Sequence, residues 1–258
     1  MKVIKDIYEY REMIVNLVKQ DLRSRYQGSV LGFLWTFINP LLQLMVYTMV
    51  FSNIMRSGIE DYAMFLFVAL IPWMFFSSCV TGGASCMIER KELIKKIYFP
   101  RRILCISYIT SAFVNMLFSF VVVFAALLLT GYGISVRLLI YLPFIMLTEY
   151  LLALGIGFFC SAVAVYLRDL QYILGIVCMA WMYLTPVMYS EKMVPEKYIQ
   201  IFRLNPMTEI IGGYRCVLYE KTAPDLSAVG CVFVFDLILL LAGNVVFGKL
   251  EKHFAEEL

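Results

Sequence analysis

Residues 23–55 read RSRYQGSVLGFLWTFINPLLQLMVYTMVFSNIM, a basic lead-in followed by an uncharged apolar segment. The apolar part, 30–51, is long enough to cross a bilayer, which takes about 20 helical residues. It nevertheless carries Asn39, Pro40 and Gln43 near its middle. In a helix that faces lipid on all sides, a proline and two amide side chains would destabilise the inserted state, because their polar groups would have no partner. The segment therefore predicts a transmembrane helix with one polar side.

The composition of the whole chain is that of a membrane protein. Of its 258 residues, 62% are hydrophobic and 16% are charged, whereas soluble domains are roughly half apolar and a quarter charged. The apolar residues gather into long runs, which predict an all-α membrane protein of one domain, 1–258, with six transmembrane helices. The predicted transmembrane helices are 30–51, 62–87, 103–132, 138–167, 170–189 and 226–247.

The segment before the first span, 1–26, has apolar residues at helical spacing and basic residues elsewhere on its surface. This pattern predicts an amphipathic interfacial helix that lies in the headgroup plane. Six basic residues lie in this segment, and six more lie in the loop 89–102. Because basic residues concentrate in cytoplasmic loops, the predicted orientation places both termini and this loop in the cytoplasm. The segment 190–225 then lies outside.

The segment 190–225 is too apolar for a solvated linker. Pro195, Asn205-Pro206 and Gly212-Gly213 divide it into two short helical pieces. Backbone breaks at membrane depth are tolerated only against protein or a water-filled cavity. We therefore expect short re-entrant helices in the outer leaflet, between the fifth and sixth spans, that cap an outward exit.

The predicted cytoplasmic loop carries an apolar pattern among its charges. Four apolar side chains are expected on one face of a short helix within 88–101: Leu93, Ile94, Ile97 and Tyr98. A loop that only carries positive charge does not need an apolar face. The pattern therefore predicts a docking helix for a soluble partner.

Two carboxylates, Glu149 and Asp236, lie inside predicted spans. Each costs about 2.5–3.5 kcal/mol at the bilayer centre, so neither should face lipid. One interpretation is a proton or cation relay. The other is an interhelical hydrogen bond to a Tyr, Ser or Thr side chain, which is favoured because no Lys or Arg accompanies these carboxylates in the spans.

No pattern in the chain predicts a bound cofactor or metal. The run from Gly243 to Lys249 matches the start of the phosphate-binding pattern GxxxxGK[ST], but Leu250 stands where that pattern needs a hydroxyl to hold magnesium. The run also closes a predicted span, whereas a phosphate loop joins a strand to a helix. Any energy source must therefore come from a partner or an ion gradient.

Short motifs follow one another along nearly the whole chain. They are Arg25-Tyr26 with Ser29, Leu31-Gly32 and Trp35; Asn39-Pro40; Leu70-Ile71-Pro72-Trp73 with Phe75-Phe76; Leu93-Ile94-Lys95-Lys96 with Phe99-Pro100-Arg101; Arg168-Asp169-Leu170; Pro186-Val187 with Tyr189; and Asn205-Pro206. In this order they resemble the permease subunit of ABC type-2 exporters of lipid-linked polysaccharides, which include O-antigen, capsule and teichoic acid exporters. Two residues depart from the family pattern, Ala69 for a common Gly and Cys105 for a common Pro.

The resemblance implies a homodimer of permeases bound to two ATP-binding cassette subunits, which would carry the ATP and magnesium. The substrate would be an undecaprenyl-linked glycan or a teichoic acid, exported across the bacterial plasma (inner) membrane among membrane lipids, with no nucleic-acid partner. The chain itself would be a transport permease and not an enzyme. Independently of the family, six helices are too few to enclose a path as wide as a sugar, which also favours a dimer.

Four groups of residues follow as candidate sites. Arg23, Arg25 and Tyr26 would meet the pyrophosphate of the lipid carrier, because arginine binds phosphate through paired donors. The predicted conduit lining is Trp35, Asn39, Gln43, Tyr47, Trp181 and Tyr183. The predicted coupling helix for the ATPase contains Glu89, Arg90, Leu93, Ile94, Ile97 and Tyr98, and the predicted outer gate contains Tyr189, Asn205, Pro206 and Tyr214.

Two other functions stay open at this point. A type-2 exporter of a drug or small lipid would have the same architecture and a narrower path. An ATP-independent, proton-coupled transporter would use Glu149 and Asp236 as its relay.

Overall fold

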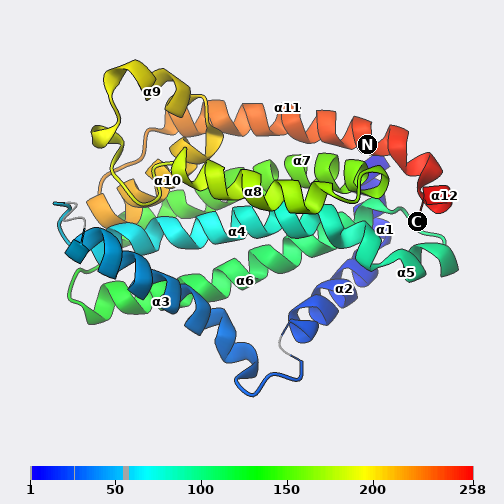
Figure 1. The fold of residues 1–258 in the computed structure, drawn as a ribbon, viewed down its shortest axis with the longest axis horizontal. Helices are drawn as coiled ribbons and strands as arrows, with labels where there is room; N and C mark the ends of the chain where they lie inside the picture. Colours follow the sequence, from blue (N-terminus) through cyan, green and yellow to red (C-terminus); the bar gives the residue numbers. More distant parts are fainter. Residues whose placement is uncertain (1, 26, 55–57, 258) are drawn as a thin grey trace.

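The computed structural model describes residues 2–25, 27–54 and 58–257, and Figure 1 shows them as an elongated bundle of helices. Within the described residues the regular structure is helical and contains no strand. The prediction of an all-α fold is therefore confirmed for the described residues. Both described ends of the chain lie at one end of the bundle, which we call the basic end, and the segment 190–225 lies at the opposite end (Figure 1).

Five of the described helices are long and apolar enough to cross a membrane. They are α3 (Trp35–Thr48, with the 3-10 turn Gly32–Leu34 before it and the π turn Met49–Ile54 after it), α4 (Tyr62–Glu89), α6 (Arg102–Leu129), α7 (Leu142–Tyr166, after the 3-10 turn Val136–Tyr141) and α11 (Leu226–Leu250). Each of them overlaps one of the predicted spans.

The fifth predicted span, 170–189, differs from the structure. The helix α8 (Leu170–Tyr183) has 14 residues and, at about 1.5 Å per residue, is shorter than the roughly 30 Å hydrocarbon core. Pro186 explains the early end, because proline has no backbone N–H and disfavours helical geometry at the residue before it. A sixth complete transmembrane helix therefore stays a prediction.

The helix α4 lies at the centre of the bundle. It contacts α3, α6, α7 and α8, and most of its side chains are buried. In contrast, α3 is largely exposed, and its first turn contacts α6 through Thr36. Because α3 is covered on one side only, its other side is left for lipid, water or another protein.

Glycine residues allow the helices α7 and α11 to pack closely against each other. A β-carbon at Gly243 of α11 would lie 2.5 Å from the carbonyl oxygen of Gly155 in α7. No side chain fits at such a distance from a backbone atom. Glycine at this position therefore allows the two backbones to approach closely, as small residues do in membrane helix pairs.

The N-terminal segment forms two helices, α1 (Lys2–Glu9) and α2 (Arg11–Ser24), where the sequence predicts one over 1–26. The helix α2 packs along α6 and buries Leu17. Tyr8 and Val15 stay exposed on the same segment. An exposed apolar strip is what a headgroup-plane helix requires, and that position stays a prediction.

The segment 190–225 contains two short helices, α9 (Glu196–Arg203) and α10 (Pro206–Arg215). They meet at Asn205, whose side chain accepts a hydrogen bond from the backbone N–H of Met207 at 3.1 Å and so caps α10. The predicted division at Gly212-Gly213 is wrong, because both glycines lie inside α10. The helix α10 packs against α4, α7 and α11, whereas α9 lies at the edge of the molecule (Figure 1).

Candidate functional site

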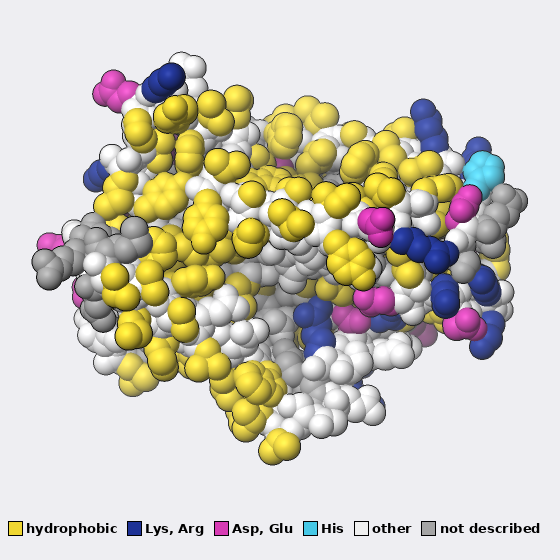
Figure 2. All heavy atoms as spheres, in the orientation of Figure 1, with side chains coloured by type: hydrophobic (Ala, Val, Ile, Leu, Met, Phe, Trp, Pro, Cys, Tyr) yellow, Lys and Arg dark blue, Asp and Glu magenta, His cyan; other side chains and the backbone are white. Residues whose placement is uncertain are grey.

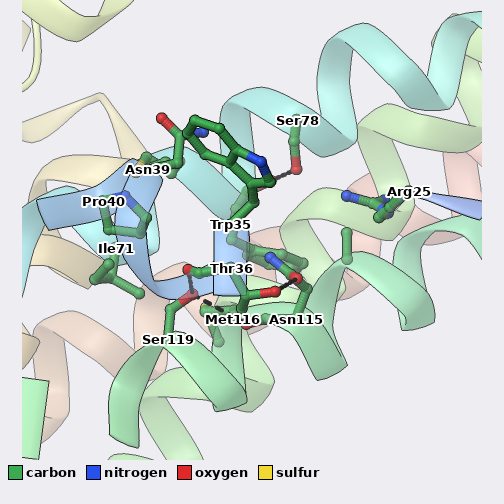
Figure 3. Close-up of a pocket in the computed structure, with 13 residues that line it drawn as sticks. Arg25, Trp35, Thr36, Asn39, Pro40, Ile71, Ser78, Asn115, Met116 and Ser119 are labelled. Carbon is green, nitrogen blue, oxygen red and sulfur yellow. Dashed lines mark hydrogen bonds between the residues drawn. The ribbon is translucent and has the colours of Figure 1, made fainter. Parts of the chain in front are cut away.

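A cavity of about 380 Å³ lies between α3, α4 and α6. Figure 2 shows the surface hollowed between α3 and the rest of the bundle, and Figure 3 shows the residues that line the cavity. They are Arg25, Trp35, Thr36, Asn39, Pro40, Ile71, Met74, Phe75, Ser78, Ala112, Asn115, Met116 and Ser119. Three residues predicted from the sequence, Arg25, Trp35 and Asn39, therefore come together around one space.

The polar wall of this cavity follows from Pro40. Proline cannot donate to the carbonyl four residues earlier, so the carbonyl of Thr36 is left without its helical partner. The hydroxyl of Ser119 on α6 donates to that carbonyl at 3.4 Å. The Thr36 hydroxyl in turn donates to the amide oxygen of Asn115 at 3.3 Å (Figure 3). The proline-containing part of α3 is thus fastened to α6 by polar groups.

Arg25 supplies the positive charge of the cavity. Its Nη2 lies 3.6 Å from Oδ2 of Asp21, and its guanidinium carbon lies 5.6 Å from the centre of the Tyr108 ring. The other oxygen of Asp21 accepts from Nη2 of Arg90 at 2.9 Å. Two arginines share one carboxylate, so the group keeps an excess positive charge. This arrangement also joins the cavity to the loop after α4.

The other two predicted entrance residues differ from Arg25. Arg23 is exposed on α2 and does not line the cavity. Tyr26 lies outside the described residues. The entrance prediction therefore rests on Arg25.

The exposed face of α3, which also borders the cavity at Trp35 and Asn39, presents amides within an apolar helix. Asn39 is exposed, and its Oδ1 accepts from Nε2 of Gln43 at 3.2 Å. Trp35 is also exposed, and its indole N–H donates to the Ser29 hydroxyl at 3.0 Å. Tyr47 lies two turns beyond Asn39 and is partly buried against the core. Because exposed amides are costly in lipid, this side of α3 requires a protein or aqueous neighbour.

The two conduit residues predicted on α8 have different surroundings. Tyr183 is exposed, as a conduit residue should be. Trp181 instead packs edge-on against the buried Phe76, with ring centres 5.0 Å apart, and its indole N–H donates to Oδ1 of Asn205 at 3.0 Å. Trp181 therefore holds the 190–225 segment in place, and the structure does not bring it to the cavity.

The predicted outer-gate residues separate into a surface group and a buried one. Asn205 donates to the Thr185 hydroxyl at 2.8 Å, and Pro206 begins α10 beside it. The Tyr189 hydroxyl donates to the Tyr183 carbonyl at 2.7 Å. The Asn205 contact fastens the end of α8 to the 190–225 segment, and the Tyr189 contact stabilises the turn 184–189 that leads into it.

Tyr214 is the buried member of that set, and it lies beneath the surface. It is completely buried, and its hydroxyl donates to Oε2 of Glu149 on α7 at 2.7 Å. This is the interhelical hydrogen bond that one interpretation of Glu149 requires. Asp236 is also buried, and neither of its carboxylate oxygens has a partner among the described residues. Neither carboxylate lines the cavity.

Arg215 is a site residue that the sequence interpretation missed. It is buried, and its Nη2 donates to the carbonyl of Val187 at 2.6 Å while its Nη1 donates to the carbonyl of Pro186. Its guanidinium carbon lies 3.7 Å from the centre of the Phe65 ring. Burial lowers the pKa of Arg215, which lies outside the candidate spanning helices, to about 9. The side chain therefore stays cationic at neutral pH.

The prediction of one apolar helix face in the loop after α4 is wrong. The helix α5 (Lys91–Lys96) ends before Ile97, whose backbone is extended. Ile94 is 8% exposed and packs into the core, whereas Ile97 and Tyr98 are 55% and 98% exposed. Leu93 is intermediate and packs against the core as well. The exposed apolar pair is therefore Ile97 with Tyr98 alone.

Two polar residues predicted for the coupling helix, Glu89 and Arg90, are engaged within the chain. Glu89 accepts from the Ser85 hydroxyl at 2.7 Å, and Arg90 binds Asp21. They fix the start of the loop to α4 and α2.

Replacing Glu149 with glutamine is expected to leave folding and transport close to wild type. The amide oxygen of glutamine can still accept from Tyr214, so the hydrogen bond between α7 and α10 is retained. Tyr214→Phe removes the donor, leaves a buried acceptor unsatisfied and should cost about 1–3 kcal/mol of stability. Thermal unfolding of both purified variants measures this difference. Loss of transport in folded Glu149→Gln protein would instead support a proton relay.

The described residues thus form a multi-pass helical membrane protein with a charged cavity beside its most exposed spanning helix, and no phosphate-binding loop. The chain belongs to the ABC-2 type transporter family, whose model matches residues 12–219.

Known relatives cover almost all of the chain. An O-antigen export system permease protein RfbA from Myxococcus xanthus is 31% identical over 100% of both chains. An RfbA permease from Klebsiella pneumoniae is 31% identical over 95% of this chain and 94% of its own. A polysialic acid transport protein, KpsM, from Escherichia coli is 20% identical over 95% of this chain and 96% of its own.

Proposed function

We propose that this chain is the membrane-spanning subunit of an ATP-driven exporter that moves a lipid-linked polysaccharide across the bacterial inner membrane. The observation that carries the proposal is the position of Arg25 on the cavity beside Trp35 and Asn39. A guanidinium group suits the phosphate of a lipid carrier. An indole face and an amide suit the first sugar. The similarity to O-antigen and polysialic acid permeases supports the same substrate class.

A homodimer would complete the transport path. The amides of Asn39 and Gln43 and the exposed Tyr183 need a neighbour that is not lipid. A second copy placed against α3 and α8 would supply that neighbour and enclose a path lined by aromatic and amide groups. Weak, repeated contacts of this kind suit a polymer that must slide. An undecaprenyl-linked glycan and a teichoic acid both meet this description.

The energy would come from two ATP-binding cassette subunits, which hold ATP and magnesium. The exposed pair Ile97 and Tyr98 would seat in them. In this arrangement both termini and the basic end lie in the cytoplasm. The helices α9 and α10 lie at the outer side, where they would gate the exit.

A small-molecule exporter is the second candidate. The cavity of about 380 Å³ is within the range of sites for one small ligand, about 300–1,000 Å³. A drug or small lipid could therefore occupy it fully, with the same partner subunits and the same fold. A proton-coupled transporter is disfavoured, because Glu149 is bound to Tyr214 and neither Glu149 nor Asp236 lines the cavity.

The proposal is tested by deleting the gene and complementing it with variants. Deletion should trap polymer inside the cell, and Arg25→Ala should restore surface polysaccharide to about a tenth of the wild-type amount or less, because a charge-assisted phosphate contact is lost. Arg25→Lys, which keeps the charge but not the paired donors, should restore an intermediate amount. Arg137→Ala, at an exposed position in the 3-10 turn before α7, is the matched control and should behave as wild type.

Unchanged surface glycan in the deletion strain would exclude the proposed substrate. A change in drug resistance without a change in glycan would favour the small-molecule exporter. Transport by the reconstituted permease without its ATP-binding partner would favour the proton-coupled transporter.

A further inference from the structure

Two arginines at the start of α6 bind the residues that follow α11. Nη2 of Arg102 lies 3.1 Å from Oε1 of Glu251, and Nη1 of Arg101 donates to the backbone carbonyl of Glu251. Each guanidinium also lies over a fully buried ring. Arg101 is 5.7 Å from the centre of Phe254, and Arg102 is 5.9 Å from the centre of Phe247. We call these five residues the clasp.

The clasp is more than a surface ion pair. The Arg102 and Glu251 side chains are 12% and 26% exposed, so water and salt screen their attraction less than that of an open pair. Arg101 adds a second donor to the Glu251 carbonyl, which also accepts from the backbone N–H of Phe254 just beyond the end of α11. The two arginines therefore fix both the backbone and the side chain of Glu251.

The clasp lies beside the exposed apolar pair of the loop. Its polar members, Arg101, Arg102 and Glu251, line a groove of about 750 Å³ that is also lined by Ile97 and Tyr98. Only Phe99 and Pro100 separate Tyr98 from Arg101, and Phe99 is buried. A displacement of the pair would therefore act directly on the clasp.

The helix α11 connects the clasp with the other end of the molecule. It runs the length of the bundle from the basic end to the 190–225 segment (Figure 1). At that end it packs against α10, the helix that carries Tyr214 and Arg215. The clasp thus connects the loop to one long helix that reaches the opposite end.

We propose that Glu251 is a positioning residue for transport, which joins the loop after α4 to α11 so that movement of the ATP-binding partner reaches the 190–225 segment. The proposal rests on the proposed function, because it assumes a partner seated on Ile97 and Tyr98. A purely structural ion pair would affect stability alone. The amount of polysaccharide exported per ATP hydrolysed distinguishes a positioning role of Glu251 from a purely structural one.

The test compares wild type, Glu251→Gln, Glu251→Arg and the charge exchange Arg102→Glu/Glu251→Arg, each as the complete complex in lipid nanodiscs or vesicles. Glu257→Gln, an exposed acid of the same segment, is the matched control. We expect Glu251→Arg to keep its ATP-binding partner and its ATP hydrolysis, while polysaccharide exported per ATP falls about fivefold or more, the usual lower bound of an energetic coupling. The charge exchange should restore at least about half of the wild-type ratio.

A second readout does not depend on the substrate. Trypsin cleavage at Lys192 and Lys197, which are exposed in the 190–225 segment, is measured with and without ATP and vanadate. Wild type should show a nucleotide-dependent change in cleavage, Glu251→Arg should lose it, and the charge exchange should regain it. Glu251→Gln, the milder variant, should lie between them.

Wild-type coupling and wild-type cleavage in Glu251→Arg and Glu251→Gln would overturn the positioning role. Loss of stability without loss of coupling would also overturn it. If wild type exports no polysaccharide but its nucleotide-dependent cleavage depends on Glu251, the proposed substrate fails while the role of the clasp is supported.

Discussion

Arg215→Met is expected to release the 190–225 segment from the rest of the bundle. The substitution keeps much of the apolar volume over Phe65 but removes the donors to the carbonyls of Pro186 and Val187. Each buried carbonyl left without a partner costs about 1–3 kcal/mol, so the variant should lose about 3 kcal/mol of stability. Thermal unfolding and the rate of trypsin cleavage at Lys192 measure the loss.

Two control variants make this result specific. Arg215→Lys keeps a positive charge with a single donor group and should recover part of the stability. Arg203→Met removes an exposed arginine of α9, whose ion pair with Glu191 is also exposed, and should have little effect. An unchanged unfolding temperature in Arg215→Met would show that the segment is held by its other contacts, among them the hydrogen bonds of Asn205.

The double substitution Ile97→Asp/Tyr98→Asp is expected to detach the ATP-binding partner without unfolding the permease. Both side chains are exposed, so the change costs little in the free chain, whereas two carboxylates in an apolar interface oppose docking. Affinity should fall about a hundredfold, equivalent to roughly 2.8 kcal/mol. Co-purification of the partner and the unfolding temperature of the permease measure the two effects separately.

Ile94→Asp should have the opposite outcome. Ile94 is buried in the core of the permease, so an aspartate there places an unpaired charge in an apolar surrounding and lowers stability. Val136→Asp, at an exposed apolar position near the other end of the bundle, is the matched control and should keep its partner. Normal partner stoichiometry in the double variant would exclude the loop as the docking surface.

The contrast between Ile94 and Ile97 shows what the sequence could not provide. The spacing of the apolar residues assumes a helix that continues to the proline, but α5 ends at Lys96, and one residue in extended geometry redirects the side chains that follow. Loop residues have no periodic neighbours to fix their direction. Their orientation is decided by packing against α4 and α6, which no local pattern reports.

The length of 30–51 predicted a spanning helix, and its composition also predicted which helix would have a polar side. Uncharged apolar runs predicted the spanning helices because a bilayer imposes length and hydrophobicity on them. Asn39, Pro40 and Gln43 predicted a polar side of α3, and the cavity lies beside Asn39 and Pro40. The early end of α8 could also have been predicted, since Pro186 disfavours helix at the residue before it.

Contacts between segments that are distant in the sequence could not be predicted from the sequence alone. Trp181 with Asn205 and Glu149 with Tyr214 join elements whose proximity depends on the packing of the whole bundle. Arg215 offered one usable indication, because it is a lone cation in the apolar run 206–218. A charge in such a run indicates a buried polar contact, although its carbonyl partners could not be named.

The glycine contact between α7 and α11 limits how this gene can vary. Every missense change in codon 243 encodes a residue with a β-carbon, which would stand 2.5 Å from the Gly155 carbonyl. On the same helix, Leu241 and Val245 are more than half exposed, and many apolar replacements fit there. Codons 241 and 245 can therefore change to many apolar residues, whereas codon 243 between them cannot. The tolerated substitutions along α11 thus lie on its exposed face, and the restricted ones lie on the face that contacts α7.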